Sequence, residues 1–98
     1  MTKVLDTTKG GQGVKTFQYV IKDQVGVHGR PAALLVKEAH QYESCIRIRK
    51  GEKTAEATKL MAVMGLGIRC GDTIVVQVEG ADEDRACEEM KEFFENNL

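Results

Sequence analysis

A histidine, an arginine and a proline stand close together in residues 25–35, which read VGVHGRPAALL. His28 is the reactive group of this stretch, because a neutral imidazole is a competent nucleophile for covalent catalysis. Pro31 suits the first position of a helix, where its missing N–H costs nothing, and apolar residues at helical spacing follow it. Backbone N–H groups at a helix start lack intrahelical partners and attract anions such as phosphate. The spacing therefore predicts an anion site directly after His28.

The residues on either side of this helix start suit the same chemistry. Gly29 has no Cβ, so the backbone can approach an anion closely there. Arg30 supplies a permanent positive charge and a planar set of donors that matches phosphate oxygens. The positive end of a helix also disfavours the imidazolium form of His28, which leaves a lone pair free for attack. The residues alone leave two interpretations open, namely covalent carriage of a phosphoryl group and plain anion binding.

The elements that must position these residues follow from hydrophobic periodicity. Strands are predicted over residues 16–21, 45–50, 53–56 and 73–79, and helices over 31–42, 58–67 and 82–98. Thr58 and Asp82 are the predicted N-caps of the second and third helices. The predicted order is β-α-β-β-α-β-α. A four-stranded sheet with three helices on one face would bury every apolar stripe, so the sequence predicts an α+β open-faced sandwich.

Length and composition limit the function classes. The 98 residues suffice for one small domain, and we expect residues 1–14 to be a disordered extension and residues 15–98 to be the domain. A formal net charge of -1 argues against a general nucleic-acid binder. No apolar stretch is long enough to span a membrane. The three cysteines form no CxxC pair, so we expect reduced thiols in a cytoplasmic protein and neither disulfides nor a zinc site.

The segment GVHGRPAALLVKEA, residues 26–39, resembles the active-site segment of the histidine-containing phosphocarrier (HPr) family of the bacterial phosphoenolpyruvate-dependent sugar phosphotransferase system. That family commonly shows a G-[LI]-H-[AT]-R-P-A pattern at this place. The likeness continues through MAVMGLGIRCGD and VEGADED and covers about residues 15–98. It implies the same open-faced sandwich, with an antiparallel sheet.

The resemblance also implies specific roles. His28 would be phosphorylated on Nδ1, and Arg30 would stabilise the phosphate together with the helix start at Gly29 and Pro31. Phosphorylated enzyme I would be the donor, and sugar-specific enzyme IIA domains the acceptors. The protein would be a monomeric cytoplasmic phosphoryl-transfer intermediate rather than an enzyme in the strict sense. It would need no metal or other cofactor, because fixed N–H groups and Arg30 stabilise the charge.

Two positions depart from the family pattern. Gly29 replaces the usual alanine or threonine, a mild change because glycine is an acceptable N-cap. Lys59 stands where many members carry a serine that a dedicated kinase phosphorylates to control sugar uptake and gene expression. Lysine cannot receive that modification, so we do not expect this regulation.

The second helix has apolar residues on two sides, and a helix this short cannot bury both. The resemblance places docking surface here, with Leu60, Met61 and Met64 as contacts, since flexible methionines suit surfaces that meet several partners. The competing interpretation is that the methionines fill gaps in the core. His40 and the basic residues Arg47, Arg49, Lys50 and Lys53 are expected to be solvated surface residues.

Two related functions remain as alternatives. One is a regulatory interaction protein of the same fold, in which the histidine is typically replaced and the serine is retained. This chain shows the opposite arrangement at His28 and Lys59, which favours carriage. The other is a carrier in a parallel, nitrogen-related phosphotransfer system, which would use the same chemistry with other acceptors.

Overall fold

The computed structural model describes residues 14–27 and 29–98. Its elements are β1 (Val14–Val20), α1 (Gly29–Ala39), β2 (Cys45–Lys50), β3 (Lys53–Glu56), α2 (Leu60–Gly65), β4 (Thr73–Glu79) and α3 (Glu83–Asn97). The predicted order β-α-β-β-α-β-α is confirmed. No helix in the described part of the chain is long and apolar enough to cross a membrane.

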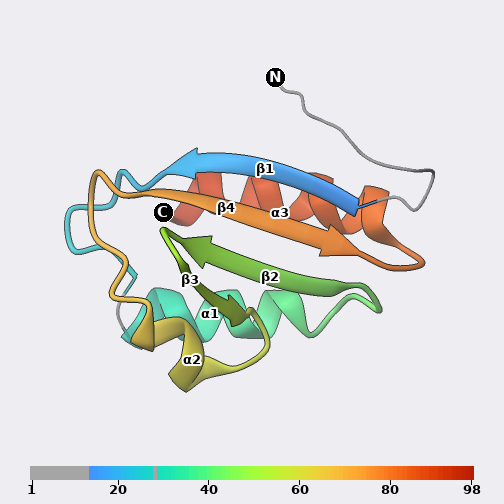
Figure 1. Cartoon of the computed structure of the whole chain (residues 1–98), viewed down its shortest axis with the longest axis horizontal. Coiled ribbons are helices and arrows are strands. Elements are labelled where there is room, and N and C mark those ends of the chain that lie inside the picture. Colours follow the sequence, from blue (N-terminus) through green and yellow to red (C-terminus); the bar gives the residue numbers. More distant parts are fainter. Residues whose placement is uncertain (1–13, 28) are drawn as a thin grey trace.

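The four strands form one sheet in the order β1-β4-β2-β3, and each neighbouring pair is antiparallel. Figure 1 shows α1 and α3 behind this sheet, on one face. The short helix α2 packs against α1 and against β3, at the lower edge of the view. No helix of the described residues covers the other face of the sheet. The predicted α+β class with an open-faced sandwich is therefore confirmed.

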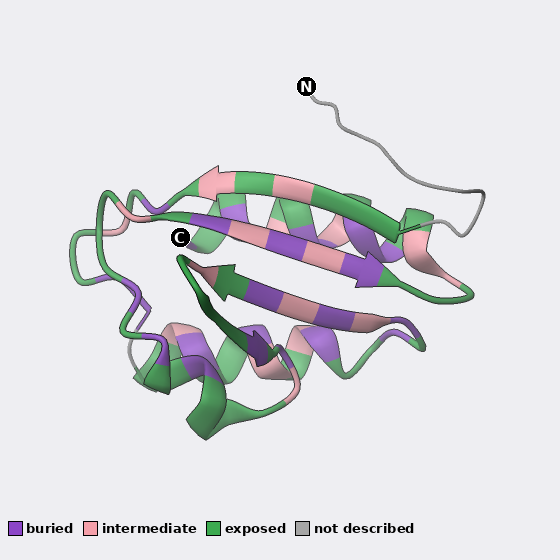
Figure 2. Cartoon of the chain, viewed as in Figure 1, coloured by how far each residue is buried: buried purple, intermediate pink, exposed green. Residues whose placement is uncertain are grey.

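The core lies between the sheet and the two long helices. Figure 2 shows the strand alternation as buried bands along β2 and β4. The buried strand side chains are Ile46, Ile48, Ala55, Ile74, Val76 and Val78, and the buried helix side chains are Ala32, Leu35, Ala39, Val63, Ala86, Cys87, Met90 and Phe94. The Phe94 ring packs edge-on against Phe17 and Tyr19, with ring centroids 5.9 and 5.5 Å apart. Aromatic packing therefore joins β1 to α3.

Several predicted boundaries differ from the structure. The first helix covers Gly29–Ala39 rather than 31–42, and the second covers Leu60–Gly65 rather than 58–67. The prediction that Thr58 caps the second helix was wrong, because Lys59 occupies the N-cap position. The first strand begins at Val14, and the rest of the expected N-terminal extension lies outside the described residues.

Asp82 is the N-cap residue of α3, as predicted, yet its side chain makes no capping bond. Its carboxylate accepts hydrogen bonds from the backbone N–H groups of Glu43 and Ser44, at 3.0 and 2.9 Å. It also accepts one from the Ser44 hydroxyl, at 2.5 Å. These bonds lower the pKa of the Asp82 carboxyl below its usual value, with the Ser44 hydroxyl as the largest cause. Asp82 therefore ties the start of α3 to the turn before β2.

Candidate phosphoryl-acceptor site

His28 lies outside the described residues, so its two neighbours locate the site. Val27, directly before it, is a buried loop residue, and Gly29, directly after it, is the first residue of α1. Only one residue thus separates the buried end of the loop from the helix. The sequence-predicted helix start after His28 is present, two residues earlier than expected.

Two details of that helix start were predicted wrongly. Pro31 is the third helical residue rather than the first, and Gly29 lies inside the helix rather than capping it. The first turn of a helix contains no intrahelical N–H bonds in any case, so a proline at the third position sacrifices none. Gly29 and Arg30 are then the residues of the first turn that present N–H groups. Both of them are exposed.

The backbone conformation at residue 29 does not require glycine. Nothing in the described structure lies within 4 Å of a Cβ built on it, and its φ is not positive. An alanine would therefore fit there, and the glycine leaves the helix start open without changing its conformation. The difference between Gly29 and the family's usual residue is sterically mild.

The segment 68–72 lies alongside the loop that leads to His28. Val27 donates its N–H to the Ile68 carbonyl at 3.1 Å. Further along, Gly71 donates to the Ile21 carbonyl at 2.8 Å, and Ile21 donates to the Asp72 carbonyl at 2.9 Å. This pairing holds the loop against a second segment of chain.

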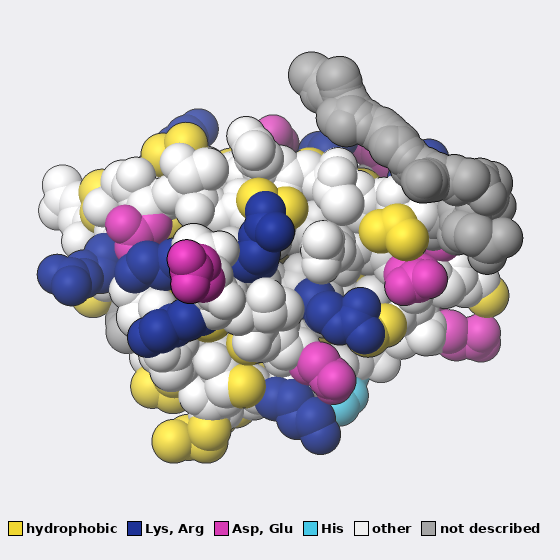
Figure 3. Space-filling model, viewed as in Figure 1, with side chains coloured by type: hydrophobic (Ala, Val, Ile, Leu, Met, Phe, Trp, Pro, Cys, Tyr) yellow, Lys and Arg dark blue, Asp and Glu magenta, His cyan; other side chains and the backbone are white. Residues whose placement is uncertain are grey.

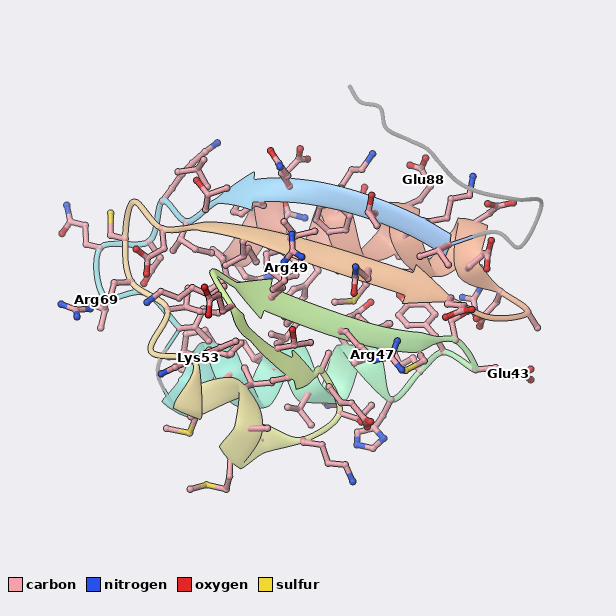
Figure 4. The ribbon with its side chains drawn as sticks, viewed as in Figure 1. Glu43, Arg47, Arg49, Lys53, Arg69 and Glu88 are labelled. Atoms are coloured by element: carbon pink, nitrogen blue, oxygen red, sulfur yellow. The ribbon has the colours of Figure 1, made fainter. Side chains whose placement is uncertain are left out.

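Residues 68–72 are themselves held in place by an ion pair and by hydrogen bonds. The Asp72 carboxylate accepts the Arg69 N–H at 2.8 Å and lies 3.0 Å from Lys50 Nζ. The Arg69 N–H, followed by the Lys50 ammonium, lowers the pKa of the Asp72 carboxyl. Lys50 also donates to the Gly67 carbonyl at 2.7 Å, so it is not the freely solvated residue that we expected. Figure 4 shows the Arg69 side chain at this end of the molecule, pointing outward.

An apolar patch on α2 is exposed. Met61 is 77% exposed, Met64 39% and Leu60 38%, whereas Val63 on the inner side is buried. Figure 3 shows hydrophobic side chains gathered over α2. Since α2 packs against α1, the patch adjoins the helix whose start carries Gly29 and Arg30. The alternative that the methionines fill the core does not fit these exposures.

Lys59 occupies the N-cap position of α2 with an exposed side chain and makes no capping hydrogen bond. Its backbone N–H donates to the Glu56 carbonyl at 3.0 Å. The position that the family often gives to a serine is therefore a solvent-facing helix start, where a cation is mildly unfavourable.

The remaining reactive side chains lie elsewhere. His40 is exposed and follows the far end of α1, so the structure separates it from Gly29 by the length of that helix. Arg47 and Arg49 project from β2 on the open face of the sheet (Figure 4). Cys87 is buried, and this burial raises the pKa of its thiol. No group of three His, Cys, Asp or Glu residues in the described ranges is placed to hold a metal ion.

Sequence reasoning missed Asp23. Its carboxylate accepts the N–H groups of Val25 and Gly26, two and three residues later. An aspartate followed closely by a glycine in a loop predicts a turn, because aspartate side chains accept hydrogen bonds from backbone N–H groups a few residues later in the chain.

The chain is similar to proteins of one family. Residues 15–96 match the family model for the PTS HPr component phosphorylation site. The phosphocarrier protein HPr of Lysinibacillus sphaericus is 40% identical over 77 residues, which cover 79% of this chain and 88% of that protein. The HPr-like protein Crh of Halalkalibacterium halodurans is 41% identical over 78 residues, covering 80% and 93%. A crystal structure of HPr from Thermoanaerobacter tengcongensis superposes with a TM-score of 0.81 at 34% identity, covering 85% and 93%.

Proposed function

Because the chain belongs to the HPr family of the bacterial phosphotransferase system, we propose that it carries a phosphoryl group on His28. The observation that supports this assignment is the match to the phosphorylation-site model over residues 15–96, together with the position of His28 immediately before the first residue of α1. The carrier is a phosphoryl-transfer intermediate that turns over only with its partner enzymes.

The transfer step needs a neutral imidazole. The Nδ1 lone pair of His28 attacks the phosphorus of the donor, phosphorylated enzyme I. A bond forms between Nδ1 and phosphorus as the bond from phosphorus to the donor breaks, and the bonding electrons leave with the donor. Passage to an enzyme IIA domain repeats this step with His28 as the leaving group.

The start of α1 stabilises the negative charge of the phosphoryl group. The N–H groups of Gly29 and Arg30 are fixed by the helix before the reaction begins, so they need no reorganisation when the phosphoryl group arrives. The Arg30 side chain is exposed and forms no ion pair with any described acidic residue, which leaves its guanidinium free for phosphate oxygens.

Leu60, Met61 and Met64 form the proposed docking patch for enzyme I and for the enzyme IIA domains. Adaptable methionine side chains suit a surface that must accept two partners in turn. The carrier acts as a cytoplasmic monomer, so the patch stays uncovered between encounters. Because Lys59 stands beside the patch where many relatives have a serine, the carrier lacks the regulation that depends on phosphorylation of that serine.

The similarity to the HPr-like protein Crh supports one second candidate, a regulatory interaction protein. His28 and Lys59 argue for carriage instead, because the regulatory members typically lack the histidine and keep the serine. A carrier of a nitrogen-related system would use the same chemistry with other acceptors. Transfer assays with enzyme IIA domains of the sugar and nitrogen-related systems distinguish the two kinds of carrier.

The deciding experiment is phosphorylation with phosphoenolpyruvate and a bacterial enzyme I, followed by mass spectrometry of the intact protein. We expect one added phosphoryl group that is lost in acid. His28→Ala abolishes the addition, and His40→Ala, which alters the other histidine, leaves it intact. Absence of the added mass in the unsubstituted protein would refute the proposal.

A further inference from the structure

The loop before His28 contains a carboxylate clamp. One oxygen of the Asp23 side chain, Oδ2, accepts the Val25 N–H at 3.2 Å and the Gly26 N–H at 3.1 Å. The Asp23 carbonyl also accepts the Gly26 N–H, at 3.0 Å. Asp23 therefore fixes the backbone of the residues that immediately precede Val27.

Gly26 brings this clamped loop against the neighbouring segment. Its φ is +80°, and a Cβ there would lie 2.6 Å from the Ile68 carbonyl oxygen and 2.8 Å from the Arg69 Cα. No side chain fits at this distance, so the close approach requires glycine. The next residue, Val27, donates its N–H to the same Ile68 carbonyl at 3.1 Å.

The other side of the clamp is anchored to the end of α3. The backbone N–H groups of Lys22 and Asp23 both donate to the Leu98 carbonyl, at 2.6 and 2.8 Å. Leu98 is buried, so this anchor belongs to the core. The Asp23 backbone is thus held by α3, and its side chain holds the loop that runs to Val27.

From these contacts we infer that Asp23 is a positioning residue for phosphoryl transfer, acting on His28 through the backbone of Val25, Gly26 and Val27. The inference rests on the proposed function of His28. The clamp and the Ile68 contact leave the chain little freedom up to Val27, and α1 begins two residues later. A fixed attachment point keeps the nucleophile aligned with the phosphoryl group, and a misplacement of about 1 Å can cost two orders of magnitude in rate.

The fold offers a matched control. Asp82 forms a similar carboxylate clamp on the backbone N–H groups of Glu43 and Ser44. Figure 4 shows Glu43 at the opposite end of the molecule from Arg69, whose backbone lies beside Gly26. Loss of either clamp removes bonds from one carboxylate to two backbone N–H groups, but only the Asp23 clamp precedes the proposed nucleophile.

The test compares Asp23→Ala, Asp23→Asn and Asp82→Ala by rapid-quench measurement of transfer from phosphorylated enzyme I. We expect Asp23→Ala to lower the maximal transfer rate about tenfold. The carrier concentration at half-maximal rate, which reports docking, changes by less than about twofold. Asp23→Asn keeps an acceptor oxygen and restores most of the rate, whereas Asp82→Ala transfers at the unsubstituted rate.

Amide hydrogen exchange on the same variants tests the clamp without phosphoryl transfer. In Asp23→Ala the Gly26 and Val27 amides exchange at least about tenfold faster, while in Asp82→Ala they do not. Equal transfer rates for Asp23→Ala and the unsubstituted protein, or unchanged exchange at Gly26 and Val27, would overturn the inference and leave the proposed function standing. An unsubstituted protein that accepts no phosphoryl group refutes both.

Discussion

The phenol oxygen of Tyr42 lies 2.7 Å from Glu89 Oε1, although 47 positions separate the two residues in sequence. The same oxygen lies 2.5 Å from Glu38 Oε2 on α1. Arg85 completes the cluster, with its guanidinium 5.1 Å from the Tyr42 ring and 3.6 Å from Glu89 Oε2. This cluster joins the end of α1 to α3 on the helical side of the sheet, and so it helps to hold the helix that carries the proposed site.

Replacing Tyr42 by phenylalanine removes the hydroxyl, whose single proton lies within hydrogen-bond distance of both the Glu38 and the Glu89 carboxylate. We expect the free energy of unfolding to fall by about 1–2 kcal/mol, measured by urea denaturation. Tyr19→Phe is the matched control, because the Tyr19 hydroxyl is buried and has no hydrogen-bond partner among the described residues. That substitution is expected to be neutral or slightly stabilising. Equal losses in both variants would contradict the role given to Tyr42.

The same cluster predicts sensitivity to alkali. Burial, followed by the hydrogen bonds to Glu38 and Glu89, raises the pKa of Tyr42 above its usual value. The unfolded chain loses the phenol proton at about pH 10, whereas the folded protein keeps it. The unfolding free energy is therefore unaffected by Tyr42 below about pH 10 and declines as the pH rises further. Stability curves between about pH 9 and 11 are expected to slope less steeply in Tyr42→Phe. A residual slope is expected from Tyr19, whose pKa burial also raises.

Lys59→Ser is expected to stabilise the protein. The N-cap position of α2 has no side-chain hydrogen bond, and its lysine places a cation at the positive end of the helix. A serine there supplies the missing acceptor, which is worth about 1 kcal/mol. Lys59→Ala removes the cation without adding a cap and should gain only a few tenths of a kcal/mol. Denaturation curves that show no advantage of serine over alanine would contradict the capping argument.

The same substitution tests the regulatory position. With an HPr-specific serine kinase and ATP, we expect the unsubstituted protein to remain unlabelled, because lysine offers no hydroxyl at residue 59. Thr58 is half-buried and precedes the N-cap, so it does not replace the missing serine. Lys59→Ser is expected to accept label at the introduced hydroxyl, as located by peptide mass spectrometry. Label on Thr58 of the unsubstituted protein would refute this prediction.

Sequence periodicity was sufficient for the fold because most of the strands and helices carry one clear apolar stripe. Ile74, Val76 and Val78 are buried and alternate with neighbours that are less buried, which is the pattern of a strand with one face in the core. The helix starts were predicted less well. A proline is tolerated anywhere in the first turn, so Pro31 limits where α1 begins without fixing the residue.

The contacts that organise the candidate site join segments that are distant in sequence. Hydrophobic periodicity is a local signal and does not show which distant segments meet. The close approach of Gly26 to Ile68 and the bond from Asp23 to Leu98 appear only once the chain is folded. Asp82 illustrates the same limit, because its N-cap position was predicted correctly while its side chain serves the turn at Ser44 instead. Local signals thus locate elements, and tertiary contacts decide what individual side chains bind.

The exposed patch on α2 gives the last prediction. Met61 is 77% exposed, so Met61→Gln should change the unfolding free energy by no more than about 0.5 kcal/mol. If the patch docks enzyme I, the carrier concentration for half-maximal transfer should rise about tenfold, since buried apolar anchors dominate interface energies. The maximal transfer rate should not change, because the start of α1 is untouched. Val20→Gln is the control, since Val20 is also apolar and 49% exposed but lies on β1, outside the patch. An equal loss of affinity in both variants would show that general surface apolarity, rather than this patch, governs docking.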